Sequence, residues 1–283
     1  MAIKRVELLA WLGARIGKPP GFERLAHRIA PMARLAHLPE ICLVRDEMLF
    51  VTRLGVPVGW HVAFFGSYEP ELRKIMRALL MPGGVAVDVG ANVGWHTLLM
   101  AQLVGAQGRV LAAEANPSAC VELDRNVQIN RLSHVEVLAH ALGATEGHIS
   151  FLEIAADEPG AASAHVTTDE NPGAGWISVR VRPLDAIVQE AGIERLDFIK
   201  VDVEGFEWPV LQGSRQTIAK HRPSIVFEFD AAYAARGGGS GPLLWDFFMQ
   251  QGYRLYAIGR NWAARVELRQ WPDCANVLAI PEK

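Results

Sequence analysis

The chain has 283 residues, of which 50% are hydrophobic and 21% are charged, and its net charge is −3. A chain of this length buries a large core, so it needs neither a disulfide nor a metal to stabilise its fold. The slightly negative charge argues against a protein that binds nucleic acid mainly through backbone phosphates.

The N-terminal segment reads as a small cap. Two helical patterns, at residues 6–16 and 22–35, are separated by the breaker Lys18-Pro19-Pro20-Gly21. Short apolar runs at residues 41–44, 49–52 and 60–63 then predict three strands. We therefore expect a helical and β-rich cap over residues 1–66 and a main domain over residues 67–283. The first residues lack a clean signal-peptide cleavage site, and no run of about 18 apolar residues suggests a membrane span.

The cap carries an uneven charge. Residues 1–38 hold seven basic and two acidic side chains. The simpler interpretation is a solvated helical face packed on the main domain. The alternative is peripheral contact with a membrane or an acidic partner. Separately from this charge, a homo-oligomer is a candidate state of the protein.

From residue 71 onward, helical patterns alternate with buried strands. Alternation of this kind predicts an α/β fold, with a doubly wound, mostly parallel sheet and helices on both faces. Two further strands, near 148–153 and 177–182, flank a polar loop at 156–175. The expected helices are 71–80, 95–104, 118–130, 207–219 and 243–250, and the expected strands are 85–89, 109–113, 135–139, 196–201, 224–229, 253–258 and 276–280.

A glycine-rich turn follows the first of these strands. Asp88 lies at the end of the strand, and Gly90, Asn92 and Gly94 lie in the turn before the next helix. Glycines there let the backbone approach a ligand closely. The spacing Gly-x-x-x-Gly differs from the Gly-x-Gly-x-x-Gly of nicotinamide enzymes, so a dehydrogenase is disfavoured. Asp88 would suit the cationic amino-acid part of S-adenosylmethionine, and Glu114, at the tip of the next strand, would accept hydrogen bonds from ribose hydroxyls.

A second group of polar residues follows the strand at 196–201. Asp202 and Glu204 come directly after it, on the edge of the sheet that carries Asp88. Methyl transfer to a hydroxyl benefits from a carboxylate that takes its proton, so both are candidate catalytic bases. Glu228, placed at the end of the following strand, is a third, and Lys200 would orient a carboxylate or lower its pKa. Alternatively, Glu204 caps the next helix and Asp202 binds the cofactor.

These motifs resemble the FkbM family of methyltransferases. The resemblance covers residues 60–283 and rests on Gly66-Ser67-Tyr68-Glu69 and on residues 88–94, 199–207, 210–213 and 222–228. Its most specific part is Lys-x-Asp-x-Glu-Gly at residues 200–205. It implies a Rossmann-like class I methyltransferase fold with an antiparallel last strand, and S-adenosylmethionine as methyl donor. Tyr68 and Glu69 would close over the cofactor, and the alternative is that they form only a helix cap and a packed ring. Asn116 completes the predicted cofactor-binding residues. Residues 1–58 lie outside the shared pattern and would set acceptor choice.

We therefore predict an S-adenosylmethionine-dependent O-methyltransferase acting on a hydroxyl of a sugar, polyketide or related small-molecule or glycan acceptor, without nucleic acid as a partner. One alternative is an N-methyltransferase acting on an amine, protein or RNA, although no Asn-Pro-Pro-Tyr type motif is present. Another is a non-catalytic docking protein that retains the fold.

Three separated cysteines without a Cys-x-x-Cys pair predict neither a zinc site nor a disulfide framework, and no histidine spacing favours another metal. We expect a cytoplasmic protein without a metal.

Overall fold

The computed structural model describes Arg28, Leu35, Gly173 and residues 38–152, 165–167, 175–259, 266–268 and 271–282. The chain divides into two compact units. The smaller unit holds Met1–Pro70 with Glu153–Ser163, and the larger holds Glu71–Leu152 with Ala164–Lys283. Apart from Arg28 and Leu35, the helices predicted at 6–16 and 22–35 lie outside the described residues. The domain boundary drawn after residue 66 stays a prediction.

The described part of the smaller unit contains a hairpin and a helix. Strands β1 (Ile41–Arg45) and β2 (Met48–Thr52) pair antiparallel, as predicted. Asp46 and Glu47 join them with φ of 49° and 66°, the left-handed pair that suits the twist of a two-residue hairpin turn.

The strand predicted at residues 60–63 is wrong, because these residues lie inside helix α4 (Pro57–Phe65). Proline occupies its first turn, where a missing N–H costs nothing, and Gly66 ends it with φ of 76°. Seven of its nine residues are buried, so the helix is apolar on nearly every side. A short run that is apolar at nearly every position has no period that separates helix from strand.

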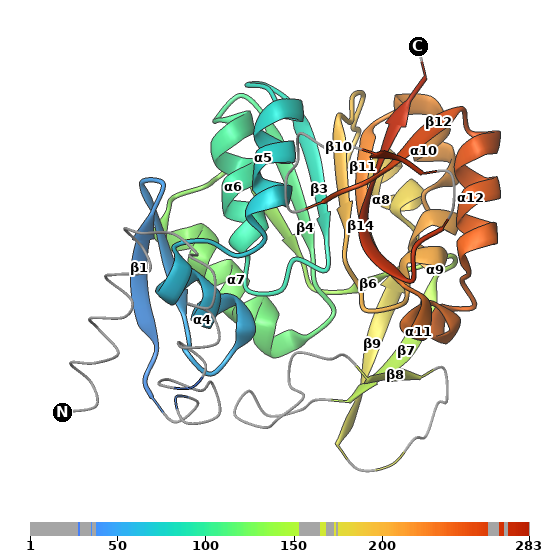
Figure 1. The fold of residues 1–283 in the computed structure, drawn as a ribbon. Helices are drawn as coiled ribbons and strands as arrows, with labels where there is room; N and C mark the ends of the chain where they lie inside the picture. Colours follow the sequence, from blue (N-terminus) through green and yellow to red (C-terminus); the bar gives the residue numbers. More distant parts are fainter. Residues whose placement is uncertain are drawn as a thin grey trace. The chain divides into compact units, whose positions relative to one another are not determined.

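The larger unit is built on an eight-stranded sheet (Figure 1). Its strand order is β13-β12-β14-β11-β10-β3-β4-β5. The five strands from β11 to β5 are parallel, and β14 runs antiparallel between β11 and β12. This order confirms the predicted mostly parallel sheet with an antiparallel last strand. The strands are β3 (Val85–Val89), β4 (Arg109–Ala113), β5 (Val135–Leu138), β10 (Phe198–Val201), β11 (Ser224–Asp230), β12 (Tyr253–Ala257), β13 (Val266–Glu267) and β14 (Cys274–Pro281).

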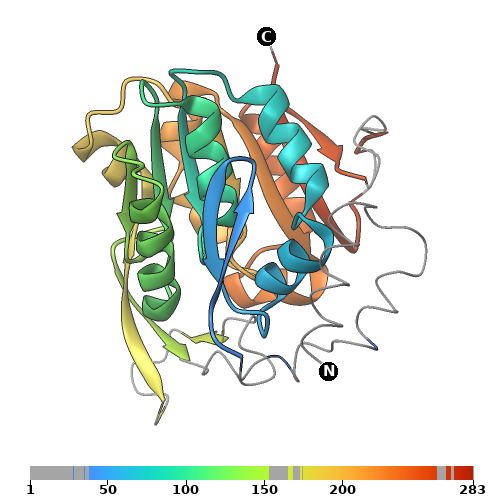
Figure 2. The same cartoon turned by 90° about the vertical axis from the view of Figure 1, so that its left-hand side faces the viewer.

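Helices cover both faces of this sheet, as the alternating pattern predicted (Figures 1 and 2). On one face the core joins the sheet to α5 (Pro70–Leu79), α6 (Trp95–Val104) and α7 (Pro117–Ile129). On the other it joins the sheet to α8 (Leu184–Glu190), α9 (Glu207–Gln212), α10 (Arg215–His221) and α12 (Gly241–Gln250). After β11 the chain forms α11 (Ala231–Ala234) and the 3-10 turn η1 (Ala235–Gly237).

A second, four-stranded sheet has the order β6-β9-β7-β8. It confirms the strands predicted near 148–153 and 177–182. Its members are β6 (Ala141–Leu142), β7 (Gly147–Leu152), β8 (His165–Thr167) and β9 (Trp176–Arg182).

The order in which the chain adds strands to the main sheet reverses direction between β3 and β10. From β3 the chain proceeds outward to β4 and β5, whereas from β10 it proceeds the other way to β11. The chain therefore leaves the carboxyl ends of β3 and β10 toward opposite edges of the sheet, and open α/β sheets bind ligands at such a switch point. The glycine loop follows β3 and the loop from Asp202 follows β10.

Candidate functional site

The glycine loop is held against the loop after β10. Gly90 has φ of 73°, and a Cβ there would lie 1.8 Å from the backbone oxygen of Asp202. Gly94 has φ of 94°, and a Cβ there would lie 2.7 Å from Leu123 of α7. Both positions thus require glycine for conformation and for packing. Between them Asn92 has φ of 49°, and its Oδ1 accepts a 2.8 Å hydrogen bond from the Val93 N–H.

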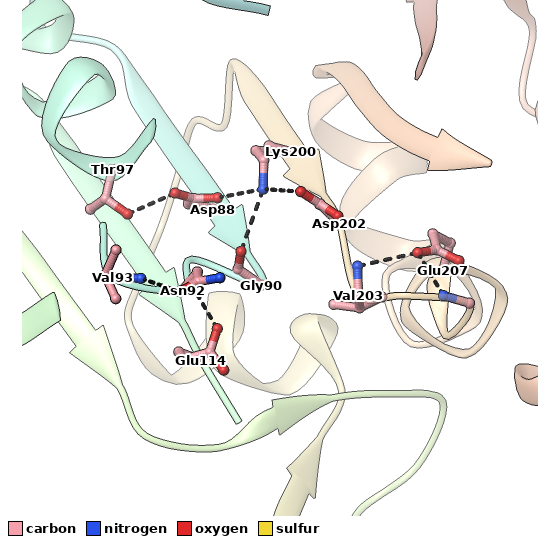
Figure 3. Close-up of polar contacts among 11 residues, drawn as sticks. Asp88, Gly90, Asn92, Val93, Thr97, Glu114, Lys200, Asp202, Val203 and Glu207 are labelled. Atoms are coloured by element: carbon pink, nitrogen blue, oxygen red, sulfur yellow. Dashed lines mark hydrogen bonds and ion pairs between the residues drawn. The ribbon is translucent and has the colours of Figure 1, made fainter. Parts of the chain in front are cut away.

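Lys200 connects the two loops electrostatically (Figure 3). Its Nζ lies 3.4 Å from Asp88 Oδ1 and 3.2 Å from Asp202 Oδ2, and it donates a 3.4 Å hydrogen bond to the backbone oxygen of Gly90. The register of the parallel strands explains this, because Lys200 and Asp88 are direct partners across β10 and β3. The structure therefore brings together Lys200, Asp88 and Asp202, as their sequence positions predicted.

The Asp88 carboxylate is completely buried. Its second oxygen, Oδ2, accepts a 2.7 Å hydrogen bond from Thr97 Oγ1 on α6. Protein groups thus approach both oxygens, as a buried charge requires. Asp88 holds Lys200 and the start of α6 in place, while a direct contact between Asp88 and a cofactor stays a prediction.

Glu114 is fixed at the end of β4 by backbone donors. Its Oε2 accepts from the Asn92 N–H and its Oε1 from the Asn116 N–H, both at 2.7 Å. Burial raises the pKa of the carboxyl, and the hydrogen bonds from the Asn116 and Asn92 backbone and the charge of Lys200 oppose that rise. Backbone donors therefore orient this carboxylate at the strand end, where the remaining lone pairs of its oxygens fit the predicted contact with ribose hydroxyls.

The Asn116 side chain caps helix α7. Its Oδ1 accepts from the N–H groups of Ser118 at 2.9 Å and Ala119 at 3.4 Å. This capping explains the residue type at the position, because asparagine is among the preferred N-caps. A cofactor contact of Asn116 stays a prediction.

The loop after β10 has an unusual backbone. Glu204 has φ of 54° and Gly205 has φ of 101°, and a Cβ on Gly205 would lie 2.3 Å from the backbone oxygen of Tyr233 in α11. Glu207, which is 5% exposed, holds this loop: its Oε1 accepts from the N–H groups of Val203 and Gly205, both at 3.2 Å. Glu207 therefore holds the loop before α9, and the N-cap of α9 is Phe206 without a side-chain capping bond, so the alternative that Glu204 caps this helix is wrong.

The other two candidate bases differ in their environments. Burial and the negative charge of Asp202 raise the pKa of the half-buried Glu204, Arg236 opposes this rise, and Asp230 adds to it. Glu228 lies opposite Asn276 of β14, two residues before β11 ends at Asp230, rather than at the strand end. Because Lys200 pairs with Val226 and side chains alternate along a strand, Glu228 lies on the same face as Lys200.

Two residues that the sequence did not single out complete the site. Thr97 bonds Asp88, and the buried Asn126 of α7 donates from Nδ2 to the backbone oxygen of Val93 at 2.9 Å. The only signal for them in the sequence is a polar residue on a helix face that is otherwise apolar. His96 is also buried, and burial, followed by the charges of Lys200 and Arg73, holds its pKa well below the ordinary value.

Tyr68 and Glu69 lie in the smaller unit. The Tyr68 ring meets the His61 ring edge to face, with 5.7 Å between centroids, and Glu69 has φ of 46°. Their predicted closure over a cofactor stays a prediction.

Across the described residues, no group of three or more His, Cys, Asp and Glu side chains is arranged to hold a metal ion. In the same part of the chain, no helix has the length and apolar character needed to cross a membrane.

Comparison with known proteins shows which protein family this chain belongs to. The family model described as "Methyltransferase FkbM domain" matches residues 88–255. The chain is 31% identical over 154 residues to Methyltransferase sdnD of Sordaria araneosa, covering 45% of this chain and 59% of the relative. It is 29% identical over 162 residues to 2-O-methyltransferase NoeI of Sinorhizobium fredii, covering 53% and 65%. With Hexuronic acid methyltransferase AglP of Haloferax volcanii it shares 30% over 190 residues, covering 67% and 74%.

Among solved structures, methyltransferase FkbM from Methylobacillus flagellatus is 16% identical, with a TM-score of 0.44 over 77% of this chain and 52% of that one. The chain spans about six tenths of the length of the first two curated relatives.

Proposed function

Because this chain belongs to the FkbM family of methyltransferases, we propose that it transfers a methyl group from S-adenosylmethionine to a hydroxyl of a sugar, polyketide or related small-molecule or glycan acceptor. Family membership supports the predicted enzyme class and, with it, S-adenosylmethionine as the methyl donor. A hydroxyl as the accepting group is supported by the name of one relative, a 2-O-methyltransferase, and a sugar as the acceptor by the name of another, a hexuronic acid methyltransferase.

One observation carries the proposal most directly. Lys200 joins the loops at the carboxyl ends of β3 and β10, and Glu114 is fixed beside the glycine loop with acceptor capacity to spare. S-adenosylmethionine, when bound, supplies an electrophilic methyl group. Glu114 would hold its ribose hydroxyls, and the narrow glycine turn would let backbone groups approach it.

The electrostatics favour Glu204 over Asp202 as the proton acceptor. Asp202 is engaged by Lys200 at 3.2 Å, which fixes its orientation. Burial raises the pKa of Glu204, and a carboxylate whose pKa lies closer to the working pH is a stronger general base. Glu204 would thus take the proton from the acceptor hydroxyl, and Asp202 would orient groups around it.

Calorimetric titration with S-adenosylhomocysteine tests the donor side. The wild-type protein should bind it with micromolar affinity and should not bind NAD. Glu114→Ala should abolish binding. Glu136→Ala on β5, which removes a half-exposed carboxylate paired with Arg109 of β4, is the matched control and should leave binding intact. Failure of the wild-type protein to bind S-adenosylhomocysteine would overturn the proposal and favour a docking protein.

Incubation with labelled S-adenosylmethionine tests the acceptor side. Transfer to methyl glucuronoside or other glycosides, abolished by Glu204→Gln with donor binding preserved, is the expected result. Transfer to amines alone would establish the N-methyltransferase alternative.

A cytoplasmic location is supported by the three free cysteines, and it stays a prediction together with homo-oligomer formation and peripheral contact of the N-terminal segment.

A further inference from the structure

Glu207 is a buried carboxylate beside the proposed catalytic loop, and the proton transfer proposed above gives it no task. It lies in the first turn of α9 and is 5% exposed. One oxygen, Oε1, accepts hydrogen bonds from two backbone donors, the N–H groups of Val203 and Gly205, each at 3.2 Å (Figure 3). These two residues flank Glu204.

The backbone between these donors is not in an ordinary conformation. Glu204 has φ of 54°, which L-residues with a Cβ seldom adopt, and Gly205 has φ of 101°. Strained residues of this kind persist only where surrounding structure holds them. On one side the loop packs against the Tyr233 backbone, and on the other it is held by Glu207.

We propose that Glu207 is a positioning residue, which fixes the backbone on both sides of Glu204 and thereby aims the Glu204 carboxylate at the acceptor hydroxyl. The inference rests on the proposed function for what Glu204 does, but not for how the loop is held. A displacement of about 1 Å in a reacting group lowers the rate about 10²-fold, so the geometry of this loop has a direct effect on turnover.

The task requires an oxygen acceptor and not a negative charge. Burial raises the pKa of Glu207 to about 7, against the backbone hydrogen bonds and with a contribution from Asp202, so the carboxyl is partly protonated near neutral pH. Glutamine offers the same oxygen at the same chain length. Leucine fills a similar volume and offers no acceptor.

Amide hydrogen exchange in the whole chain tests whether Glu207 holds the loop, and it needs no methyl acceptor. We call the two hydrogen bonds from Val203 and Gly205 to Glu207 the clamp. In Glu207→Leu, exchange at Val203 and Gly205 should accelerate at least about tenfold, the effect of losing about 1.4 kcal/mol of hydrogen bonding. Glu207→Gln should exchange like the wild type. Glu190→Leu, which changes a glutamate that is 63% exposed, is the control and should also match the wild type.

Turnover of methyl glucuronoside provides the second measurement. Glu207→Leu should lower kcat about 10²-fold while S-adenosylhomocysteine affinity changes less than about twofold, and Glu207→Gln should restore kcat. If the wild type does not methylate this probe, the proposed acceptor fails, whereas the exchange measurement still decides the clamp. Unchanged exchange in Glu207→Leu, or a Glu207→Gln variant as impaired as Glu207→Leu, would overturn the inference.

Discussion

The buried carboxyl of Glu207 should make the stability of the fold depend on pH. Burial raises its pKa from 4.5 to about 7 in the folded protein, whereas the unfolded chain restores the ordinary value. Between these pH values the folded state binds a proton that the unfolded state has released. Stability contributed by this proton is therefore complete below about pH 4.5 and is lost as pH rises to about 7. The pKa difference corresponds to about 3 kcal/mol.

The comparison of wild type with Glu207→Gln isolates this effect. Glutamine does not titrate, so the free energy of unfolding of the variant, relative to wild type, should increase by about 3 kcal/mol between pH 4.5 and pH 8. Urea unfolding at closely spaced pH values measures it, and the titrations that both proteins share cancel in the difference. A difference that stays constant across this range would refute the reasoning, since it would mean that the folded state does not perturb the Glu207 carboxyl.

Three further substitutions test the framework of the site. Lys200→Met leaves the fully buried Asp88 without its cation and should lower the free energy of unfolding by about 3–5 kcal/mol in urea denaturation, with partial recovery when Asp88→Asn is added. Gly90→Ala should destabilise the fold more than Gly83→Ala, because both positions have positive φ but only the first would place a Cβ 1.8 Å from a backbone oxygen; equal melting temperatures would contradict this. Asn116→Ala should cost about 1 kcal/mol in thermal unfolding through loss of the α7 cap, whereas Asn116→Asp should not.

The main fold could be predicted because its elements carry strong local signals. The strands β3, β4 and β10 are short apolar runs between turns and helices, and the sheet buries them on both faces. The prediction fails where a segment is apolar throughout, as in α4, or short, as in the seven-residue α8 and the two-residue β13. In these segments the period is absent or too short, and packing decides the conformation.

The site shows the same division between local and tertiary information. Asp88, Glu114 and Lys200 could be placed from sequence, since the carboxyl ends of parallel strands share one edge of the sheet. The helix residues that support them could not be predicted. The contacts of Thr97 with Asp88 and of Asn126 with the Val93 backbone depend on how each helix is rotated over the sheet. Glu204 and Glu207 both lie in the motif after β10. The sequence does not tell which of the two accepts the hydrogen bonds of the loop, because this depends on the left-handed backbone at Glu204.

The arrangement around Lys200 also changes how substitutions at this edge must be interpreted. One lysine charge lies between two carboxylates, of which Asp88 is fully buried and Asp202 is 29% exposed. Removing Asp88 takes one of these two carboxylates from Lys200 and removes the acceptor of the Thr97 hydroxyl, so the effect reaches the loop after β10 as well as the glycine loop. Loss of cofactor binding in Asp88→Ala would therefore not prove a direct contact. Asp88→Asn retains an oxygen that accepts from Thr97 and removes the negative charge. If this variant still binds S-adenosylhomocysteine, Asp88 acts as a support of the two loops. If it does not bind, the negative charge of Asp88 is required for binding.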